Sequence, residues 1–330
     1  MSTYTRVNMS TFIKDKINLD PEVTKKARSS RDFLHEQLVA LPEKTTNFPK
    51  LFSNRETFNY GSFSRRTKIR PLDDIDFMLL FSANGTTYFQ DGGTIKMIPP
   101  ATAEELYVLR DDNGYLNSRK LLNKIRDNIN KVSQYKNSDI NTRKEVVTLK
   151  LISYDWTFDI VPAFKTSEES DGRSYYLIPD GNGHWQKTDP RIDQNRVTNL
   201  NKSIDYNVIE FIRIIKYCNK VHSSLKLSSY LIENLVLDYF ENDEGELWLT
   251  RPYQLMGFFK YLKSAIWSAV WDPKEIQGDL NDLDLSKKYS VDSKANEFMA
   301  AVQDAIDFED AKDYENADKK WRIVFGDEYE

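Results

Sequence analysis

An acidic pair inside an apolar run, Asp74-Ile75-Asp76, constrains the fold of this chain more than any other sequence feature. Side chains of a β-strand point alternately to its two faces, so both carboxylates share one face. The opposite face is apolar and is formed by Ile75, Phe77, Leu79 and Phe81. Asp73 falls on that apolar side by the same alternation, so we assign Asp74 and Asp76 as the functional pair. The chain must therefore hold two anions side by side on a sheet whose other face is buried.

A third carboxylate, Asp159, has similar surroundings. It lies between Phe158 and Ile160 in another predicted strand, and those two side chains point to the opposite face. Three like charges near an apolar sheet repel one another unless cations intervene, and Mg²⁺ binds carboxylate oxygens together with substrate phosphates. This set favours metal-assisted phosphoryl chemistry. The carboxylates alone leave an alternative open, in which Asp74 and Asp76 lie on a solvated strand face and Asp159 is unrelated.

A Gly-Ser turn precedes the acidic strand. Gly61-Ser62 opens a predicted helical turn, where backbone N–H groups and a hydroxyl can bind an anion, and basic side chains follow within residues 65–70. A polyphosphate would fit there. An ordinary turn beside a solvated basic patch is the alternative, and the two-carboxylate strand so soon afterwards makes it the weaker interpretation.

Composition limits the class of protein and the kind of metal site. The chain has 330 residues, a net charge of −5 and 40% hydrophobic residues, which excludes a strongly basic nucleic-acid coat protein and allows about two domains. A single cysteine and three scattered histidines cannot form a zinc cluster, so a metal must be bound mainly by oxygen. No signal core or membrane-spanning run is visible and the mean hydropathy is −0.62, so we expect a cytoplasmic protein without a membrane partner.

The hydrophobic spacing predicts a mixed α/β half up to about residue 200 and a helical half after it. An acidic-apolar strand and a β-hairpin are expected over residues 74–81, 145–153 and 156–164. The expected helices cover residues 20–41, 104–132, 204–221, 229–240, 252–271 and 294–325. Strands are expected to stop after the glycine-containing loop at 180–183, and Trp185 is expected to be a packing residue rather than a ligand.

Several of these motifs together resemble the polymerase-β-like nucleotidyltransferases, and more narrowly the bacterial cGAS/DncV-like enzymes (CD-NTases). The shared features of the catalytic core are Gly61-Ser62, Thr67-Lys68-Ile69, Asp74-Ile75-Asp76 and Phe158–Pro162. The narrower likeness rests on Ile178–Asp180, Trp185, Thr188–Pro190, Ile212–Tyr217, Ser228–Glu233 and Trp321–Gly326. The resemblance implies an α+β fold: a nucleotidyltransferase core with a bracing N-terminal helix over residues 1–200, a C-terminal helical, OAS-like domain over 201–330, and an active site in the cleft between them.

The resemblance also implies a role for individual residues. Asp74, Asp76 and Asp159 would be the catalytic carboxylates and would bind two Mg²⁺ ions, for which Mn²⁺ can substitute. Gly61 and Ser62 would bind the donor triphosphate, Lys216 and Ser229 would contact it from the helical domain, and Tyr230 would stack on a base. The helical spacing of Ile212, Ile215 and Cys218 agrees with this, since it turns them inward and leaves Lys216 at the edge of a cleft.

The implied activity is the joining of NTPs, ATP and another purine nucleotide, into a cyclic di- or trinucleotide second messenger with release of pyrophosphate. In this family such a product serves anti-phage (CBASS) signalling through an effector encoded separately. The net charge of −5 argues against activation by long nucleic acid. The alternative is a nucleotidyltransferase with the same three carboxylates that makes a linear oligonucleotide or modifies RNA or a protein.

Overall fold

A computed structural model describes residues 3–52, 58–204, 207–242 and 250–329 of the chain. The chain divides into two compact units. The sheet unit comprises residues 21–65 and 72–191, and the helical unit comprises residues 1–20, 66–71 and 192–330. This division differs from the predicted one near residue 200, because two short N-terminal stretches, 1–20 and 66–71, belong with the C-terminal helices.

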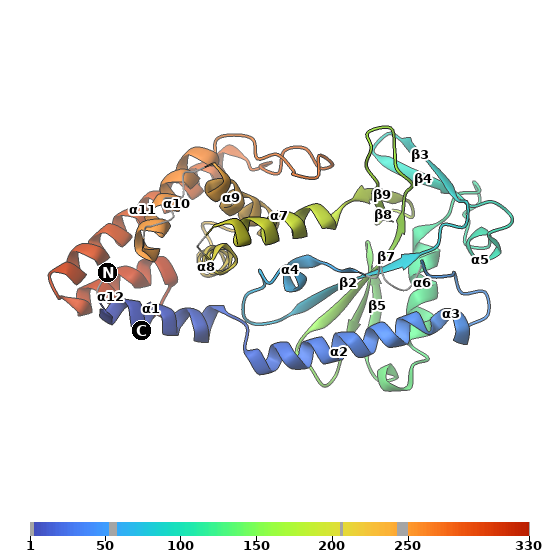
Figure 1. Cartoon of the computed structure of the whole chain (residues 1–330), viewed down its shortest axis with the longest axis horizontal. Helices are drawn as coiled ribbons and strands as arrows, with labels where there is room; N and C mark the ends of the chain where they lie inside the picture. Colours follow the sequence, from blue (N-terminus) through green and yellow to red (C-terminus); the bar gives the residue numbers. More distant parts are fainter. Residues whose placement is uncertain (1–2, 53–57, 205–206, 243–249, 330) are drawn as a thin grey trace. The chain divides into compact units, whose positions relative to one another are not determined.

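The sheet unit is built on one mixed sheet (Figure 1). Its strands follow the order β1-β2-β7-β8-β9-β4-β3, while β6 pairs with both β7 and β5. The strands are β1 (Phe58–Asn59), β2 (Asp74–Phe81), β3 (Thr87–Asp91), β4 (Thr94–Ile98), β5 (Asp139–Arg143), β6 (Val146–Lys150), β7 (Thr157–Lys165), β8 (Tyr176–Pro179) and β9 (Trp185–Thr188). The central pair β2 and β7 is parallel, and the predicted hairpin is confirmed as the antiparallel pair β6 and β7.

The helices of the sheet unit correct one prediction. They are α2 (Pro21–Val39), α3 (Leu41–Lys44), α4 (Gly61–Ser64), α5 (Glu104–Tyr107) and α6 (Ser118–Ile129). The helix predicted over 104–132 is interrupted, because Gly114 has a φ of 86° and the Asn117 side chain caps a new helix by accepting from the Lys120 N–H at 3.1 Å. Strands also continue beyond residue 183, since β9 follows. Its Trp185 is fully buried and donates to the Leu116 carbonyl at 2.9 Å, as a packing residue does.

The remaining helices run in chain order from α1 at the N-terminus to a long pair at the C-terminus. They are α1 (Thr3–Phe12) with a π-helical turn over Ile13–Ile17, α7 (Pro190–Ser203), α8 (Val208–Val221), α9 (Ser229–Glu241), α10 (Arg251–Ala265), α11 (Leu285–Asp310) and α12 (Tyr314–Phe325). The single helix predicted over 294–325 is wrong. Lys312 adopts a φ of 61°, and the Asp313 carboxylate caps α12 by accepting from the Asn316 N–H at 3.3 Å.

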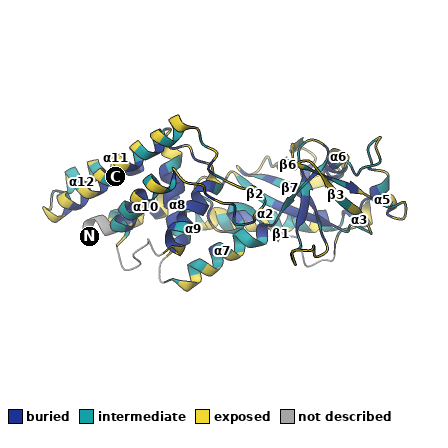
Figure 2. Cartoon of the chain, turned by 90° about the horizontal axis from the view of Figure 1, so that it is seen from above, coloured by how far each residue is buried: buried dark blue, intermediate teal, exposed yellow. Residues whose placement is uncertain are grey.

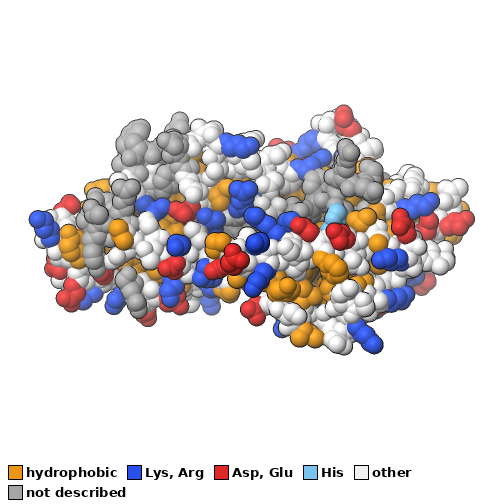
Figure 3. Space-filling view, turned by 60° about the horizontal axis from the view of Figure 1, so that its bottom comes forward, with side chains coloured by type: hydrophobic (Ala, Val, Ile, Leu, Met, Phe, Trp, Pro, Cys, Tyr) orange, Lys and Arg blue, Asp and Glu red, His pale blue; other side chains and the backbone are white. Residues whose placement is uncertain are grey.

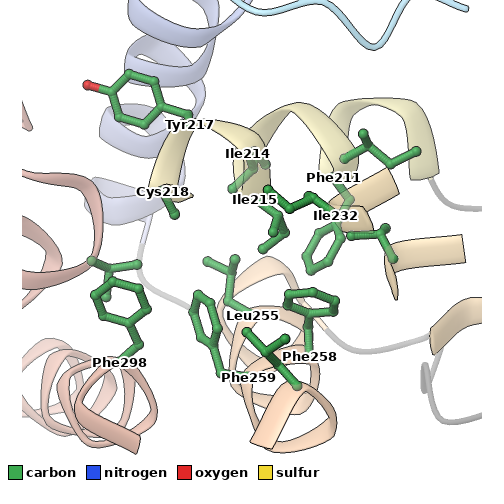
Figure 4. Packing of buried hydrophobic residues seen from close by; sticks show 14 of the residues in the cluster. Phe211, Ile214, Ile215, Tyr217, Cys218, Ile232, Leu255, Phe258, Phe259 and Phe298 are labelled. Carbon is green, nitrogen blue, oxygen red and sulfur yellow. The ribbon is translucent and has the colours of Figure 1, made fainter. Parts of the chain in front are cut away.

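The core of the helical unit is rich in aromatic side chains (Figure 4). Phe211 of α8 meets Phe258 of α10 edge-on, with ring centroids 5.7 Å apart, and Phe259 packs against Phe298 at 4.9 Å. Helices α8 and α9 are among the most deeply buried elements (Figure 2). A polar side chain on their inner faces must therefore be paired, because burial without a partner is costly.

The exposed surface carries charges of both signs. On the face shown in Figure 3, Lys and Arg side chains are mixed with Asp and Glu and with small hydrophobic areas. Because charges of both signs are mixed on this surface, local groups of charges rather than the net charge decide where a polyphosphate can bind.

Within the described ranges, no helix combines the length and the apolarity needed to cross a bilayer.

Candidate active site

Two neighbouring strands bring the predicted carboxylates together. Strands β2 and β7 run parallel in a register that makes Asp76 the direct partner of Asp159, and Asp74 that of Thr157. Neighbouring strands lie about 4.8 Å apart, and paired residues point to the same face. The apolar residues adjacent to the carboxylates in sequence are almost fully buried on the opposite face: Ile75, Phe77, Phe158 and Ile160 are each at most 2% exposed. The three aspartates therefore share one face of the sheet.

Asp73 does not lie on the apolar face of the strand, where the simple alternation of side chains predicted it. Strand β2 begins at Asp74, and Asp73 is an exposed residue just before it rather than part of the apolar face. Its backbone carbonyl accepts a hydrogen bond from the Thr157 N–H at 2.9 Å. Its backbone thus helps to hold the two strands in register, while its carboxylate lies outside the strand.

Gly61 lies directly against the Asp76 carboxylate. A Cβ atom added to this glycine would be 1.8 Å from Asp76 Oδ2, and its φ is +76°, in the left-handed region. The short pairing of β1 with β2 and the buried Phe63 hold the turn at this position. Ser62, the next residue, is half-buried. The predicted Gly-Ser turn and the predicted acidic strand are therefore in contact, and a side chain at position 61 would displace the carboxylate.

Tyr60, which precedes the turn, was not among the predicted site residues. Burial raises the pKa of its phenol well above the usual range, and Asp76, Asp159, Glu145 and Asp74 raise it further. The phenol therefore stays protonated. Its electrostatic environment shows that negative charge converges at this place, although only its position next to Gly61-Ser62 could have pointed to it in the sequence.

The donor set on this face fits a hard divalent cation. Its ligand atoms are carboxylate oxygens on adjacent, in-register strands, and Mg²⁺ prefers such oxygens over nitrogen or sulfur. Within the described parts of the chain, no three His, Cys, Asp or Glu side chains are already gathered as a metal-ligand set.

Lys216 is not exposed at an edge, as the sequence predicted, but is buried within the helical unit. Its side chain is 6% exposed and forms an ion pair with Glu233 of α9. The lysine also donates to the Thr67 carbonyl at 3.3 Å. The prediction that Ile212 and Ile215 face inward is confirmed, but Lys216 turns inward beside them because a buried carboxylate is there to receive it.

Ser229 is the first residue of α9 and is exposed. The preceding Ser228 caps this helix, and its hydroxyl accepts from the Leu231 N–H at 3.2 Å. The capping role therefore belongs to Ser228, while the Ser229 side chain projects from the first helical turn toward solvent. Its predicted role in contacting a triphosphate stays a prediction.

Tyr230 is part of a charged network that the sequence did not indicate. Its hydroxyl lies 2.8 Å from both Asp193 Oδ1 and Asp272 Oδ1 and also contacts the Lys274 ammonium. That ammonium lies 3.9 Å from the centre of the tyrosine ring. Burial raises the pKa of the Tyr230 phenol, and so do the two carboxylates. Lys274 thus lies at the hydroxyl end of the ring, where its ammonium contacts the phenol oxygen.

Comparison with known proteins places the chain in a family. Residues 91–201 match the model of the Second Messenger Oligonucleotide or Dinucleotide Synthetase domain. A protein of Bacillus cereus (strain VD146), described as a probable cyclic nucleotide synthase, is 48% identical over 318 residues, which cover 96% of this chain and 95% of that protein. The chain therefore belongs to the bacterial cGAS/DncV-like nucleotidyltransferases, the CD-NTases.

Solved structures share the fold at low sequence identity. The structure of Escherichia coli MS115-1 CdnC with ATP matches with a TM-score of 0.71 and 18% identity, over 98% of both chains. The apo form of Vibrio cholerae DncV matches with a TM-score of 0.65 and 13% identity, over 96% of this chain and 92% of that one. DncV, described as a cyclic AMP-GMP synthase, has also been solved with the linear intermediate pppA(3′,5′)pG. These likenesses confirm the predicted α+β fold with a helical C-terminal region.

Proposed function

We propose that this protein is a Mg²⁺-dependent synthase that joins NTPs into a cyclic di- or trinucleotide and releases pyrophosphate. The observation that carries the proposal is the register of β2 and β7, which sets Asp76 beside Asp159 with Asp74 on the same face. The relatives support it, because one is described as a probable cyclic nucleotide synthase and another as a cyclic AMP-GMP synthase. ATP and a second purine nucleotide are the proposed substrates, and the product would act in anti-phage (CBASS) signalling through a separately encoded effector.

Each residue of the sheet unit has a distinct part in the proposed reaction. Asp74, Asp76 and Asp159 would hold two Mg²⁺ ions, which when bound lower the pKa of the attacking hydroxyl and neutralise charge on the phosphates. Asp159 would accept the proton from the ribose hydroxyl that attacks the α-phosphorus. Gly61 keeps the space beside Asp76 clear of a side chain, and the backbone of the turn would lie along the donor phosphates.

The helical unit carries three further residues for which we propose a role in binding the NTP. Ser229, exposed at the start of α9, would donate to the triphosphate. Lys216 would neutralise part of its charge from its position beside Glu233. Tyr230 would stack on the base with its aromatic ring.

The reaction class is tested by pyrophosphate release. We expect the purified protein to release pyrophosphate from NTPs in the presence of Mg²⁺ or Mn²⁺. The release should stop when EDTA is added in excess. Adding long double-stranded DNA should leave the rate unchanged. Release that persists in EDTA would contradict metal-dependent chemistry, and a requirement for DNA would contradict the proposed independence from nucleic acid.

Replacing Tyr230 tests the proposed stacking. Tyr230→Ala removes the ring, and because stacking on a base is worth about 1–3 kcal/mol, the KM for the NTP should rise by about 5- to 150-fold. Tyr230→Phe is the matched control, since it keeps the ring and loses the hydroxyl bonds to Asp193, Asp272 and Lys274. Its KM should stay close to that of the wild type while its free energy of unfolding falls by about 1–3 kcal/mol. Equal KM values for all three proteins would remove Tyr230 from the nucleotide site.

A further inference from the structure

Three polar side chains meet in the interior of the helical unit. Glu233 Oε1 accepts from the Thr67 hydroxyl at 2.9 Å and from the Lys216 ammonium, which also donates to the Thr67 carbonyl at 3.3 Å. Lys216 and Glu233 are 6% and 3% exposed, and Thr67 is fully buried. A carboxylate so deeply buried is stable only with charged or hydrogen-bonded partners, so these groups hold one another in place.

The same helix binds the backbone around Thr67 at several points. We call residues 66–71 the strap. Arg213 Nη1 donates to the Arg66 carbonyl at 3.1 Å, Lys216 Nζ donates to that of Thr67, and Lys220 Nζ donates to that of Arg70 at 3.0 Å. Positions 213, 216 and 220 are spaced three and four apart, so they lie on one face of α8. This basic face therefore follows the strap along its length.

The strap is also attached to the N-terminal part of the helical unit. The Arg70 N–H donates to the Ile17 carbonyl at 3.0 Å, and Arg70 Nε donates to the Asn18 carbonyl at 3.0 Å. Ile69 packs against the hydrophobic core of the unit. The strap is thus held by side chains of α8 and by backbone carbonyls of Ile17 and Asn18.

The place of the strap in the sequence connects it with the reaction. It follows the Gly61-Ser62 turn closely and continues through Leu72 into β2, which carries Asp74 and Asp76. The turn and the strand belong to the sheet unit, whereas the strap belongs to the helical unit. The strap is therefore the stretch of chain that connects the Gly61-Ser62 turn with the strand that carries the carboxylates.

We propose that Glu233 is a positioning residue, which joins Lys216 and Thr67 and thereby fixes the strap and, through it, the start of the catalytic strand. This inference rests on the proposed function of Asp74 and Asp76. Because one carboxylate atom receives both the lysine and the threonine, a change at Glu233 affects the strap and the lysine together. Glu233 itself acts through other residues and contacts no reacting atom.

The test uses the full chain with two variants, Glu233→Gln and Thr67→Val. Both should lower kcat by about 10-fold or more, since small displacements of catalytic groups are costly. Hydrogen exchange of peptides that cover residues 66–71, followed by mass spectrometry, should be about 10-fold faster. The kcat of the double variant should be only slightly lower than that of the worse single variant, because the two residues act as one unit. Thr67→Ser, which keeps the hydroxyl, should restore kcat and slow exchange.

Glu309→Gln is the matched control. Glu309 is 4% exposed, and its carboxylate accepts from Trp321 Nε1 at 2.9 Å on the C-terminal helices, away from the strap. It should lower the thermal stability without changing kcat or exchange in the strap. If Glu233→Gln behaves in the same way, the proposal is wrong. If Glu233→Gln does not fold, Thr67→Val decides alone, and a normal kcat and normal exchange in that variant overturn the proposal.

A wild-type protein that makes no nucleotide product would refute the proposed function, while the exchange comparison would still show whether Glu233 holds the strap. An active wild type with an equally active, folded Glu233→Gln variant would refute only the positioning role.

Discussion

Asp76→Asn should abolish nucleotide transfer, with a rate at least about 10³-fold below that of the wild type. The substitution keeps the shape of the side chain and removes one negative charge from the face shared with Asp159, its partner in the β2–β7 register. Since cation binding depends on that charge, neither raised NTP nor raised Mg²⁺ should restore the rate fully. The measurement is the initial rate of pyrophosphate release.

The same variant should be at least as stable as the wild type. Removing one of several neighbouring carboxylates relieves repulsion, so the thermal unfolding midpoint should be unchanged or higher. Asp73→Asn is the control, because it changes the same residue type just outside the strand, where the side chain is exposed. It should keep wild-type activity. Full activity in Asp76→Asn, or an equal loss in Asp73→Asn, would contradict the assignment of the carboxylates.

Gly61→Ala should lower activity by about 10²-fold, although it adds only a methyl group. The new Cβ would lie 1.8 Å from Asp76 Oδ2, so the carboxylate must move by more than 1 Å, and a displacement of that size costs about this much in rate. The φ of +76° adds strain of about 1–2 kcal/mol for any residue with a Cβ. Activity and the free energy of unfolding should therefore fall together.

Gly172→Ala separates the two effects. Gly172 belongs to the same unit and has the same φ of +76°, but a Cβ there would meet nothing within 4 Å. Its free energy of unfolding, measured with urea, should fall by about 1–2 kcal/mol because of the backbone strain, while its activity should stay at the wild-type level. If Gly61→Ala loses no more activity than Gly172→Ala, contact with Asp76 has no catalytic importance.

The sequence predicted those parts of the site that depend on local periodicity. The alternation in β2 and β7 is a period of two, so the shared face of Asp74 and Asp76 and the apolar neighbours of Asp159 could be read directly. The contact between Gly61 and Asp76 could not, because it depends on how β1 and a short helical turn pack against β2. Tyr60 was missed for the same reason.

Predictions were weaker where the deciding partner lies far along the chain. Helical spacing correctly predicted that Ile212 and Ile215 face inward. The burial of Lys216 could not be predicted in this way, because it depends on Glu233, which lies on another helix. The break between α11 and α12 was also invisible, since Ala311-Lys312-Asp313 contains neither glycine nor proline. Tyr230 could be placed at the start of α9, but its network with Asp193 and Lys274 depends on tertiary contacts.

The most direct measurement of the central claim is the mass of the product. The protein is incubated with the four NTPs, singly and mixed, with Mg²⁺, then treated with phosphatase and analysed by chromatography and mass spectrometry. We predict a phosphatase-resistant product with the mass of a cyclic di- or trinucleotide containing adenine, which is absent with Asp76→Asn. A product that phosphatase converts to a dephosphorylated linear oligonucleotide, or a cyclic product that Asp76→Asn still makes at the wild-type rate, would contradict the account.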